Sequence, residues 1–262
     1  MNLDIEWCHH TFNAWWGCAK DCEACMNCYA KAHSPRFFLS GINAPRYRAL
    51  EKHWLLPLNW NAAAQKVGKR ARVFCASMAD IFEDHSGVTA NRERLWRMIE
   101  STPWLDWLLL TKRPENIGSM VPWTGSWPRN IWLGASAENQ KRANERIPVL
   151  LSHPAEVHFV SAEPLLSALD LRPYMTGTAS LDWVITVGES GASARPTQEE
   201  WIRDVRDQCC DHGVNFFFKQ WGRFAPDLDG RLMRLRSDKE AGRTLDGREW
   251  NEIPGGRLPN AR

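Results

Sequence analysis

The chain has 262 residues, a formal net charge of +2, eight cysteines and fifteen tryptophans. This length suits one large α/β domain, and (β/α) barrels commonly reach it as a single unit. Its apolar runs fall short of the roughly eighteen residues that a membrane span needs, so we expect no membrane partner. Eight cysteines in a chain this long, behind an N-terminus with no basic region followed by an apolar run, favour a reducing cytoplasm.

Four cysteines crowd into one short loop near the N-terminus: Cys18, Cys22, Cys25 and Cys28. Thiolates are soft ligands that select iron–sulfur clusters, zinc or Cu(I). Structural zinc usually draws two close pairs from separated segments, whereas three thiolates of one compact loop can hold three irons of a [4Fe–4S] cluster and leave the fourth open. Two subsets fit: Cys18-x3-Cys22-x2-Cys25, the spacing common to radical S-adenosylmethionine (SAM) enzymes, and Cys18-x6-Cys25-x2-Cys28. Structural zinc, disulfides and incidental buried thiols are the alternatives.

Residues 31–72 form an insertion after this loop and carry an uneven charge. Nine basic residues stand there against Glu51 alone, a local balance of +8, so the rest of the chain sums to −6. Cations follow phosphates and aromatic faces stack on bases, so this segment is a candidate nucleic-acid surface. The alternative is a solvated face over the barrel. We expect one helix near residues 46–53. The aromatic residues of the segment include Phe37, Phe38, Tyr47, Trp54 and Trp60.

Between residues 72 and 222, short apolar runs alternate with helix-compatible segments. The runs are 72–80, 107–115, 131–139, 157–165, 183–191 and 215–222. Continuous apolar runs are typical of strands buried on both faces, as in a parallel sheet. Segments 91–100 and 198–212 carry apolar residues at helical spacing. With a further strand near residues 10–15 that leads into the cysteine loop, the pattern predicts an α/β fold, a full or partial (β/α) TIM-like barrel of seven strands.

Each predicted strand ends in small, polar or charged residues, and in such barrels the loops after the strands build the site. We therefore expect these residues to converge with the cysteine loop on one rim. A helix N-cap or a surface charge is the alternative for any one of them, and is favoured for Ser136 or Ser161 alone. The candidates are Lys112, Arg113, Ser136, Glu138, Ser161, Glu163, Gly188, Glu189, Ser190 and Lys219.

The repeating pattern ends at residue 222, so we expect a barrel over residues 1–222 and a loop-rich tail over 223–262 that packs on it. No second globular domain is expected. The dipeptide Asp246-Gly247 is typical of a tight turn and predicts a small hairpin within residues 245–254.

Taken together, these motifs resemble a phage- and prophage-associated family of unknown function that is considered radical-SAM-like. The likeness covers nearly the whole chain. Two departures concern the cysteine loop: Cys22 falls inside the family's x6 gap, and residues 12–14 replace a W-N-P triplet. The resemblance favours Cys18, Cys25 and Cys28 as ligands and leaves Cys22 open. The matching motifs are Gly17-Cys18-x6-Cys25-x2-Cys28-Tyr29-Ala30 and those at residues 77–82, 110–114, 134–140, 158–165, 188–196 and 216–222.

The resemblance implies a (β/α) barrel of the radical SAM type, a [4Fe–4S] cluster, SAM and a cellular electron donor, with an unassigned substrate. Carboxylates accept charge-assisted hydrogen bonds, so Glu138, Glu163 and Glu189 are candidates for the amino group or ribose hydroxyls of SAM. Lys112 and Arg113 are expected to hold an anionic substrate. The remaining cofactor-binding and catalytic candidates are Ser136, Ser161, Gly188, Ser190, Tyr29 and Lys219. The alternative is a non-catalytic nucleic-acid-binding protein stabilised by zinc or an iron–sulfur cluster.

Overall fold

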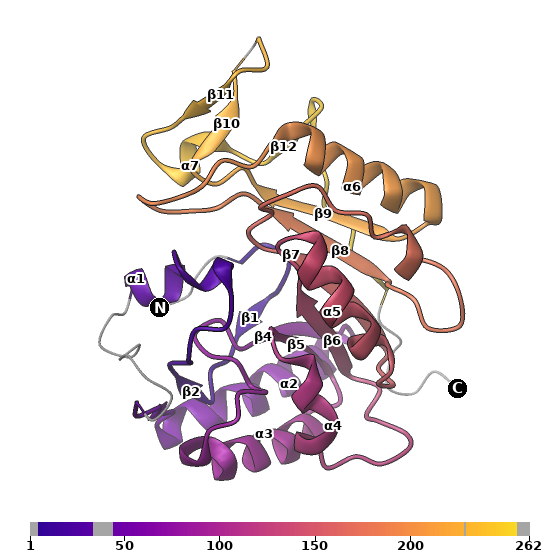
Figure 1. Ribbon diagram of the computed structural model, residues 1–262. Coiled ribbons are helices and arrows are strands. Elements are labelled where there is room, and N and C mark those ends of the chain that lie inside the picture. The colour runs from indigo at the N-terminus through magenta and orange to yellow at the C-terminus, as the bar shows by residue number, and fades with distance from the viewer. Residues whose placement is uncertain (1–4, 34–43, 228, 256–262) are drawn as a thin grey trace.

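A seven-stranded sheet forms the centre of the computed structural model, which describes residues 5–33, 44–227 and 229–255. The strand order is β1-β4-β5-β6-β7-β8-β9, and every neighbouring pair is parallel. The sheet curls into a half-barrel (Figure 1). The predicted partial barrel of seven parallel strands is therefore confirmed. The strands are β1 His10–Thr11, β4 Ala71–Cys75, β5 Leu105–Thr111, β6 Ile131–Ser136, β7 Val157–Ala162, β8 Trp183–Val187 and β9 Asn215–Gln220.

Helices cover the outer face of this sheet (Figure 1). They are α2 Leu56–Val67, α3 Thr89–Ser101, α4 Ile117–Met120, α5 Gln140–Leu151 and α6 Glu199–His212. The helices predicted at 91–100 and 198–212 are confirmed as α3 and α6. Alternate strand residues such as Val73, Leu109 and Val184 belong to the same buried cluster as Leu95 of α3 and Ile147 of α5. Because successive strand residues point to opposite faces, the other set faces the inside of the half-barrel.

Aromatic residues fill the inside of the half-barrel. Trp7, from the segment before β1, is fully buried. The centroid of its ring lies 4.5 Å from the ring centroid of Phe74 and 6.0 Å from that of Trp183. Phe159 reaches the same cluster because Gly134 stands opposite it: a Cβ at Gly134 would lie 2.3 Å from the Phe159 ring. This aromatic cluster makes the interior of the half-barrel a packed core.

The prediction of a helix over residues 46–53 in the insertion is wrong. Strand β3 (Tyr47–Arg48) pairs antiparallel with β2 (Trp15–Trp16) outside the barrel, and the 3-10 helix η3 (Glu51–Leu55) leads into α2. Pro57 suits the first turn of α2, and Gly68, with φ of +70°, ends it in the left-handed conformation. Phe37 and Phe38 lie outside the described residues.

The tail after β9 contains two hairpins and a short helix. The predicted hairpin around Asp246-Gly247 is confirmed: both residues have positive φ, 52° and 77°, as the hairpin turn requires. No helix in the described ranges is long and apolar enough to cross a membrane. The elements of the tail are β10 Phe224–Pro226, β11 Leu232–Arg234, α7 Asp238–Ala241, β12 Thr244–Leu245 and β13 Arg248–Glu249.

Candidate functional site

The cysteine loop runs from β2 to the short helix α1 (Tyr29–His33), and the 3-10 helix η1 (Glu23–Cys25) lies within it. The sequence predicted one strand over residues 10–15 before this loop. The chain instead leaves the barrel after β1, because Trp15 and Trp16 pair with Arg48 and Tyr47 of the insertion. The insertion therefore anchors the start of the loop.

A cavity of about 420 Å³ lies where the cysteine loop meets the C-terminal ends of the parallel strands. Its apolar lining includes Trp7, Phe74 and Leu110. Of the residues singled out from the sequence, all but Cys22, Glu138 and Ser161 line it. The tertiary structure thus gathers motifs from β4 to β9 around one space. The singled-out residues in the lining are Cys18, Cys25, Cys28, Tyr29, Lys112, Arg113, Ser136, Glu163, Gly188, Glu189, Ser190 and Lys219.

Three of the four clustered thiols, those of Cys18, Cys25 and Cys28, line this cavity. Burial raises the pKa of Cys18 above its ordinary value, and the nearby carboxylates of Asp80 and Glu83 raise it further. The pKa of Cys25 is lowered to about 5, chiefly by a hydrogen bond from Cys22 and, against the opposing effect of burial, by the positive charge of Lys112. Three thiols around one cavity are a donor set that fits an iron–sulfur cluster with one open iron.

Cys22 is the clustered cysteine that does not line the cavity. Its sulfur lies 3.9 Å from that of Cys25, and it also contacts Glu138 and Arg146. Cys22, Glu23 and Glu138 offer ligand atoms within 4.8 Å of one another. However, Arg146 donates to Glu138 over 2.9 Å and the Arg142 guanidinium lies 3.9 Å from it, so positive charge is already supplied and a metal cation is disfavoured there.

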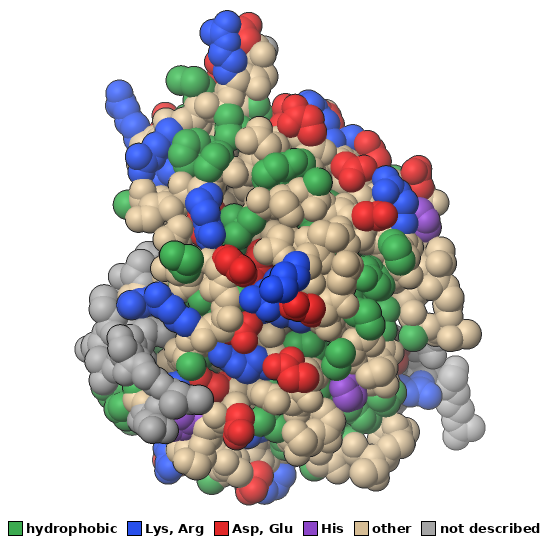
Figure 2. Space-filling view, in the orientation of Figure 1, with side chains coloured by type: hydrophobic (Ala, Val, Ile, Leu, Met, Phe, Trp, Pro, Cys, Tyr) green, Lys and Arg blue, Asp and Glu red, His purple; other side chains and the backbone are tan. Residues whose placement is uncertain are grey.

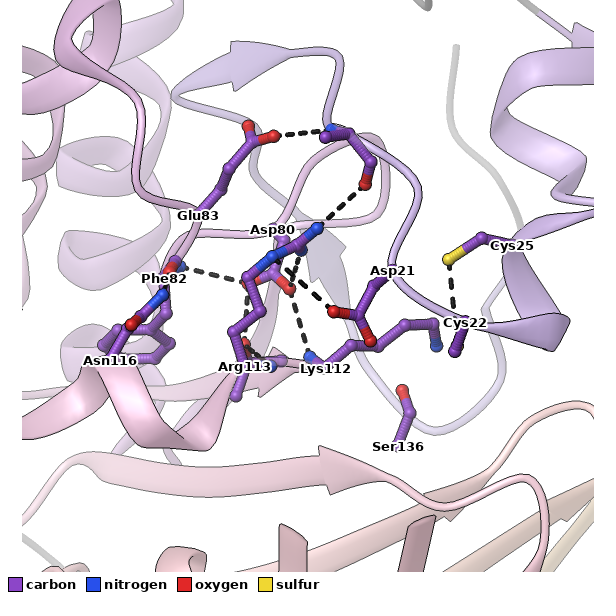
Figure 3. Close-up of polar contacts among 12 residues, drawn as sticks. Asp21, Cys22, Cys25, Asp80, Phe82, Glu83, Lys112, Arg113, Asn116 and Ser136 are labelled. Atoms are coloured by element: carbon purple, nitrogen blue, oxygen red, sulfur yellow. Dashed lines mark hydrogen bonds and ion pairs between the residues drawn. The ribbon is translucent and has the colours of Figure 1, made fainter. Parts of the chain in front are cut away.

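Arg113 joins the cysteine loop to the strand ends (Figure 3). Its guanidinium donates to the Ala19 carbonyl over 2.9 Å and to the Asp80 carboxylate over 2.9 Å. Asp80 also accepts from Thr111 Oγ1 at 2.7 Å and from the backbone N–H of Lys112 at 3.1 Å. Arg113 was expected to hold an anionic substrate, but these contacts use its guanidinium to hold the loop.

Two further arginines hold the same loop. Arg146 of α5 donates to Asp21 over 2.6 Å and is itself nearly buried. Arg195 donates to the Glu23 carbonyl over 3.2 Å, while Asn27 of the loop donates to the Ser193 carbonyl over 2.7 Å. Contacts from three separate parts of the barrel therefore position the cysteine loop.

The three candidate carboxylates differ in their surroundings. Glu138 is fully buried beside Arg146 and does not line the cavity. Glu163 lines it, pairs with Lys219 over 2.6 Å and accepts from Ser161 over 3.4 Å. Burial opposes the ionisation of Glu189, but hydrogen bonds from Arg195 outweigh it, so the pKa of Glu189 lies below its ordinary value. Glu163 and Glu189 thus place hydrogen-bond acceptors on the cavity wall.

Gly188, after β8, allows its backbone to approach the backbone of Trp221, after β9, very closely. A Cβ at Gly188 would lie 1.8 Å from the Trp221 carbonyl oxygen, so only glycine fits this approach. It places Ser190 next to Gln220, which donates to the Ser190 hydroxyl over 2.8 Å. The motifs after β8 and β9 therefore form one wall.

Sequence reasoning identified Arg113 but missed Asp80, Arg146 and Asp21 among the residues that hold the loop. Asp80 lies in the loop after β4, inside the motif at residues 77–82, and its place after a strand was the available indication. Nothing in the sequence marked Arg146 or Asp21, because their pairing joins residues 125 positions apart.

The basic segment presents less positive charge than its composition indicates. Arg46 pairs with Glu83 over 2.7 Å and Arg70 with Asp106 over 2.6 Å, and both pairs are buried. Trp54 is buried, and Trp60 stacks on His10 at 4.2 Å. On the face of the molecule drawn in Figure 2, Lys and Arg side chains are mixed with Asp and Glu side chains. In the part of this segment that the structure describes, the exposed cations are Lys31, Arg48, Lys52, Lys66 and Lys69.

Comparison with known proteins identifies a family model, described as "Protein of unknown function (DUF5131)", that matches residues 2–254. No curated protein and no solved structure matches the chain.

Proposed function

We propose, from the chemistry of its site, that this chain, which belongs to the DUF5131 family of proteins of unknown function, is a radical SAM-type iron–sulfur enzyme. In this proposal Cys18, Cys25 and Cys28 hold a [4Fe–4S] cluster, and SAM binds in the same cavity. The substrate is unassigned, and a nucleic acid base or a nucleotide is the candidate class.

The observation that carries this proposal is the division of the four cysteines. Three thiols line one cavity while Cys22 points toward Arg146 and Glu138. Three thiolates leave one iron of a four-iron cluster without a protein ligand, and that iron can bind a small molecule. The cavity also has the volume of a ligand pocket, about 420 Å³, and an apolar side with a few polar groups.

The bound cofactors would supply an electron that cleaves SAM to methionine and a 5′-deoxyadenosyl radical, which abstracts a hydrogen atom from the substrate. The chain supplies position and exclusion of water. Glu163 and Glu189 are acceptors for the amino group or ribose hydroxyls of SAM. Trp7, Phe74 and Leu110 give the cavity a dry side, which limits reaction of a radical with solvent.

A second candidate is a zinc-stabilised module that binds nucleic acid without catalysis. The Cys22–Cys25 sulfur separation of 3.9 Å favours it, because two thiolates on a tetrahedral zinc with Zn–S of about 2.3 Å lie roughly 3.8 Å apart. Against it, the other two cysteines of the loop line the cavity together with Cys25.

Anaerobic reconstitution separates the two candidates. The enzyme proposal expects brown protein with iron, sulfide and broad absorption near about 400 nm, and expects the reduced protein to form 5′-deoxyadenosine from SAM slowly without substrate. Cys25→Ala is the control, since it should lack both properties. Colourless protein with stoichiometric zinc would support the second candidate, and a reduced four-iron protein that leaves SAM intact would contradict the enzyme proposal.

A further inference from the structure

The cavity wall carries three cationic side chains, and they differ in whether a carboxylate pairs with their positive charge. Lys219 is paired with Glu163 at 2.6 Å, and Arg113 is paired with Asp80 at 2.9 Å. Lys112 is the third cation of the lining, and among the described residues its ammonium group has no carboxylate within ion-pair distance.

The backbone of Lys112 is held firmly. Its N–H donates to Asp80, and its neighbours Thr111 and Arg113 bond to the same carboxylate. The side chain then extends from the end of β5 toward Cys22 and Cys25 (Figure 3). Lys112 and Cys25 also line the same cavity. Lys112 therefore places an uncompensated positive charge beside the proposed cluster ligands.

We propose that Lys112 sets the reduction potential of the cluster. This inference rests on the proposed function, because it requires a cluster on Cys18, Cys25 and Cys28. Reduction adds one negative charge to a centre that thiolates have already made negative, and net charge and surroundings determine cluster potentials. A fixed cation in a partly dehydrated cavity stabilises that added charge more than it would in water. Lys112 thus lets a weaker electron donor reduce the cluster, and it acts through the cluster rather than on the substrate.

The test is a potentiometric titration of the reconstituted protein without SAM, followed by the electron paramagnetic resonance of the reduced cluster. Lys112→Met should shift the potential to a more negative value, and Lys112→Arg should restore it toward that of the wild type. Lys141→Met is the matched control, because that lysine is 71 % exposed on α5 and its removal should leave the potential unchanged.

The outcomes separate the inference from the proposed function. A wild-type protein that assembles no four-iron cluster would overturn both. A wild-type cluster whose potential is the same in Lys112→Met would overturn only the role of Lys112. Lys112→Gln keeps a polar side chain and serves as a second neutral variant. Loss of cluster loading in both neutral variants would assign Lys112 to assembly and overturn its role in the potential.

Discussion

Cys22 and Cys25 lie with their sulfur atoms 3.9 Å apart, yet only Cys25 lines the cavity. Cys22 instead contacts Arg146 and Glu138 on the side of α5. Two cysteines three positions apart in the sequence therefore have different surroundings, and on this difference rests our proposal of Cys18, Cys25 and Cys28 as the ligands.

The first prediction concerns those ligands. Cys18→Ala, Cys25→Ala and Cys28→Ala should each abolish cluster loading, because in the proposed site each thiolate holds one iron and metal binding is coupled to local folding. Cys22→Ser should load normally, and Cys210→Ser, at an exposed position on α6, is the control. Iron and sulfide analysis after anaerobic reconstitution measures the effect. Full loading of Cys28→Ala with loss in Cys22→Ser would show that the other subset is correct.

The second prediction concerns Glu189. Glu189→Gln should weaken SAM binding while cluster loading is retained, because an amide is a weaker acceptor than a carboxylate. Equilibrium binding of SAM to the reconstituted variant measures this. Glu189 also accepts from Asn27 of the cysteine loop over 3.3 Å. Loss of cluster loading in the variant would therefore show that Glu189 holds the loop, and unchanged SAM binding would remove it from the SAM site.

The third prediction concerns Asp80. Asp80→Asn should lower the free energy of unfolding by about 2–3 kcal/mol, because it removes the nearer counterion of the largely buried Arg113 guanidinium and leaves only Asp21 at 3.9 Å. Urea unfolding measures the loss. Glu51→Gln is the matched control: it breaks the pair with Arg94 at a carboxylate that is 82 % exposed, and should cause no measurable change. Equal effects of the two substitutions would contradict a structural role for Asp80.

The fourth prediction concerns the packing of the inner core. Gly134→Ala should destabilise the protein by about 1–3 kcal/mol, because overpacking forces the Phe159 ring to move. Gly255→Ala meets no atom within 4 Å and is the control. Combining Gly134→Ala with Phe159→Leu should recover part of the loss in thermal unfolding. A Gly134→Ala protein as stable as the wild type would show that the ring has room to shift.

The fifth prediction concerns nucleic acid. If the basic segment binds nucleic acid, affinity should fall steeply with added salt, and replacing Lys52, Lys66 and Lys69 together by Gln should flatten that slope through loss of counterion release. These lysines are exposed, whereas Arg46 is unsuitable because its substitution would break a buried ion pair. Fluorescence anisotropy with single-stranded DNA or RNA at several salt concentrations gives the slope. Absent binding at low salt would point to a small-molecule or protein substrate.

The sequence by itself determined the strands of the half-barrel. Six apolar runs from residue 72 onward coincide with β4 to β9, because strands buried on both faces leave continuous apolar segments. Helices α3 and α6 were readable from apolar spacing, and the hairpin at Asp246-Gly247 from the turn chemistry of its two central residues. These features depend on neighbours in the chain.

The predictions for the first strand and for the insertion were wrong because both segments take part in a pairing between residues far apart in the chain. Trp15 was predicted to end a barrel strand, but Trp15 and Trp16 pair with Arg48 and Tyr47, more than thirty positions away. The helix of the insertion starts at Leu56 and not near Arg46, because Tyr47 and Arg48 are used in that pairing.

Tertiary structure alone decided which polar residues face the cavity and which hold the loop in place. Lys112 and Arg113 are adjacent in sequence, but Arg113 bonds to Asp80 and Ala19 while Lys112 extends toward Cys25. Glu138 and Glu163 follow neighbouring strands in similar motifs. Glu138 pairs with Arg146 and does not line the cavity, whereas Glu163 pairs with Lys219 and does line it. Local sequence carries periodicity and turn chemistry, whereas the partner of a charged side chain is set by segments that only the folded chain brings within a few ångströms.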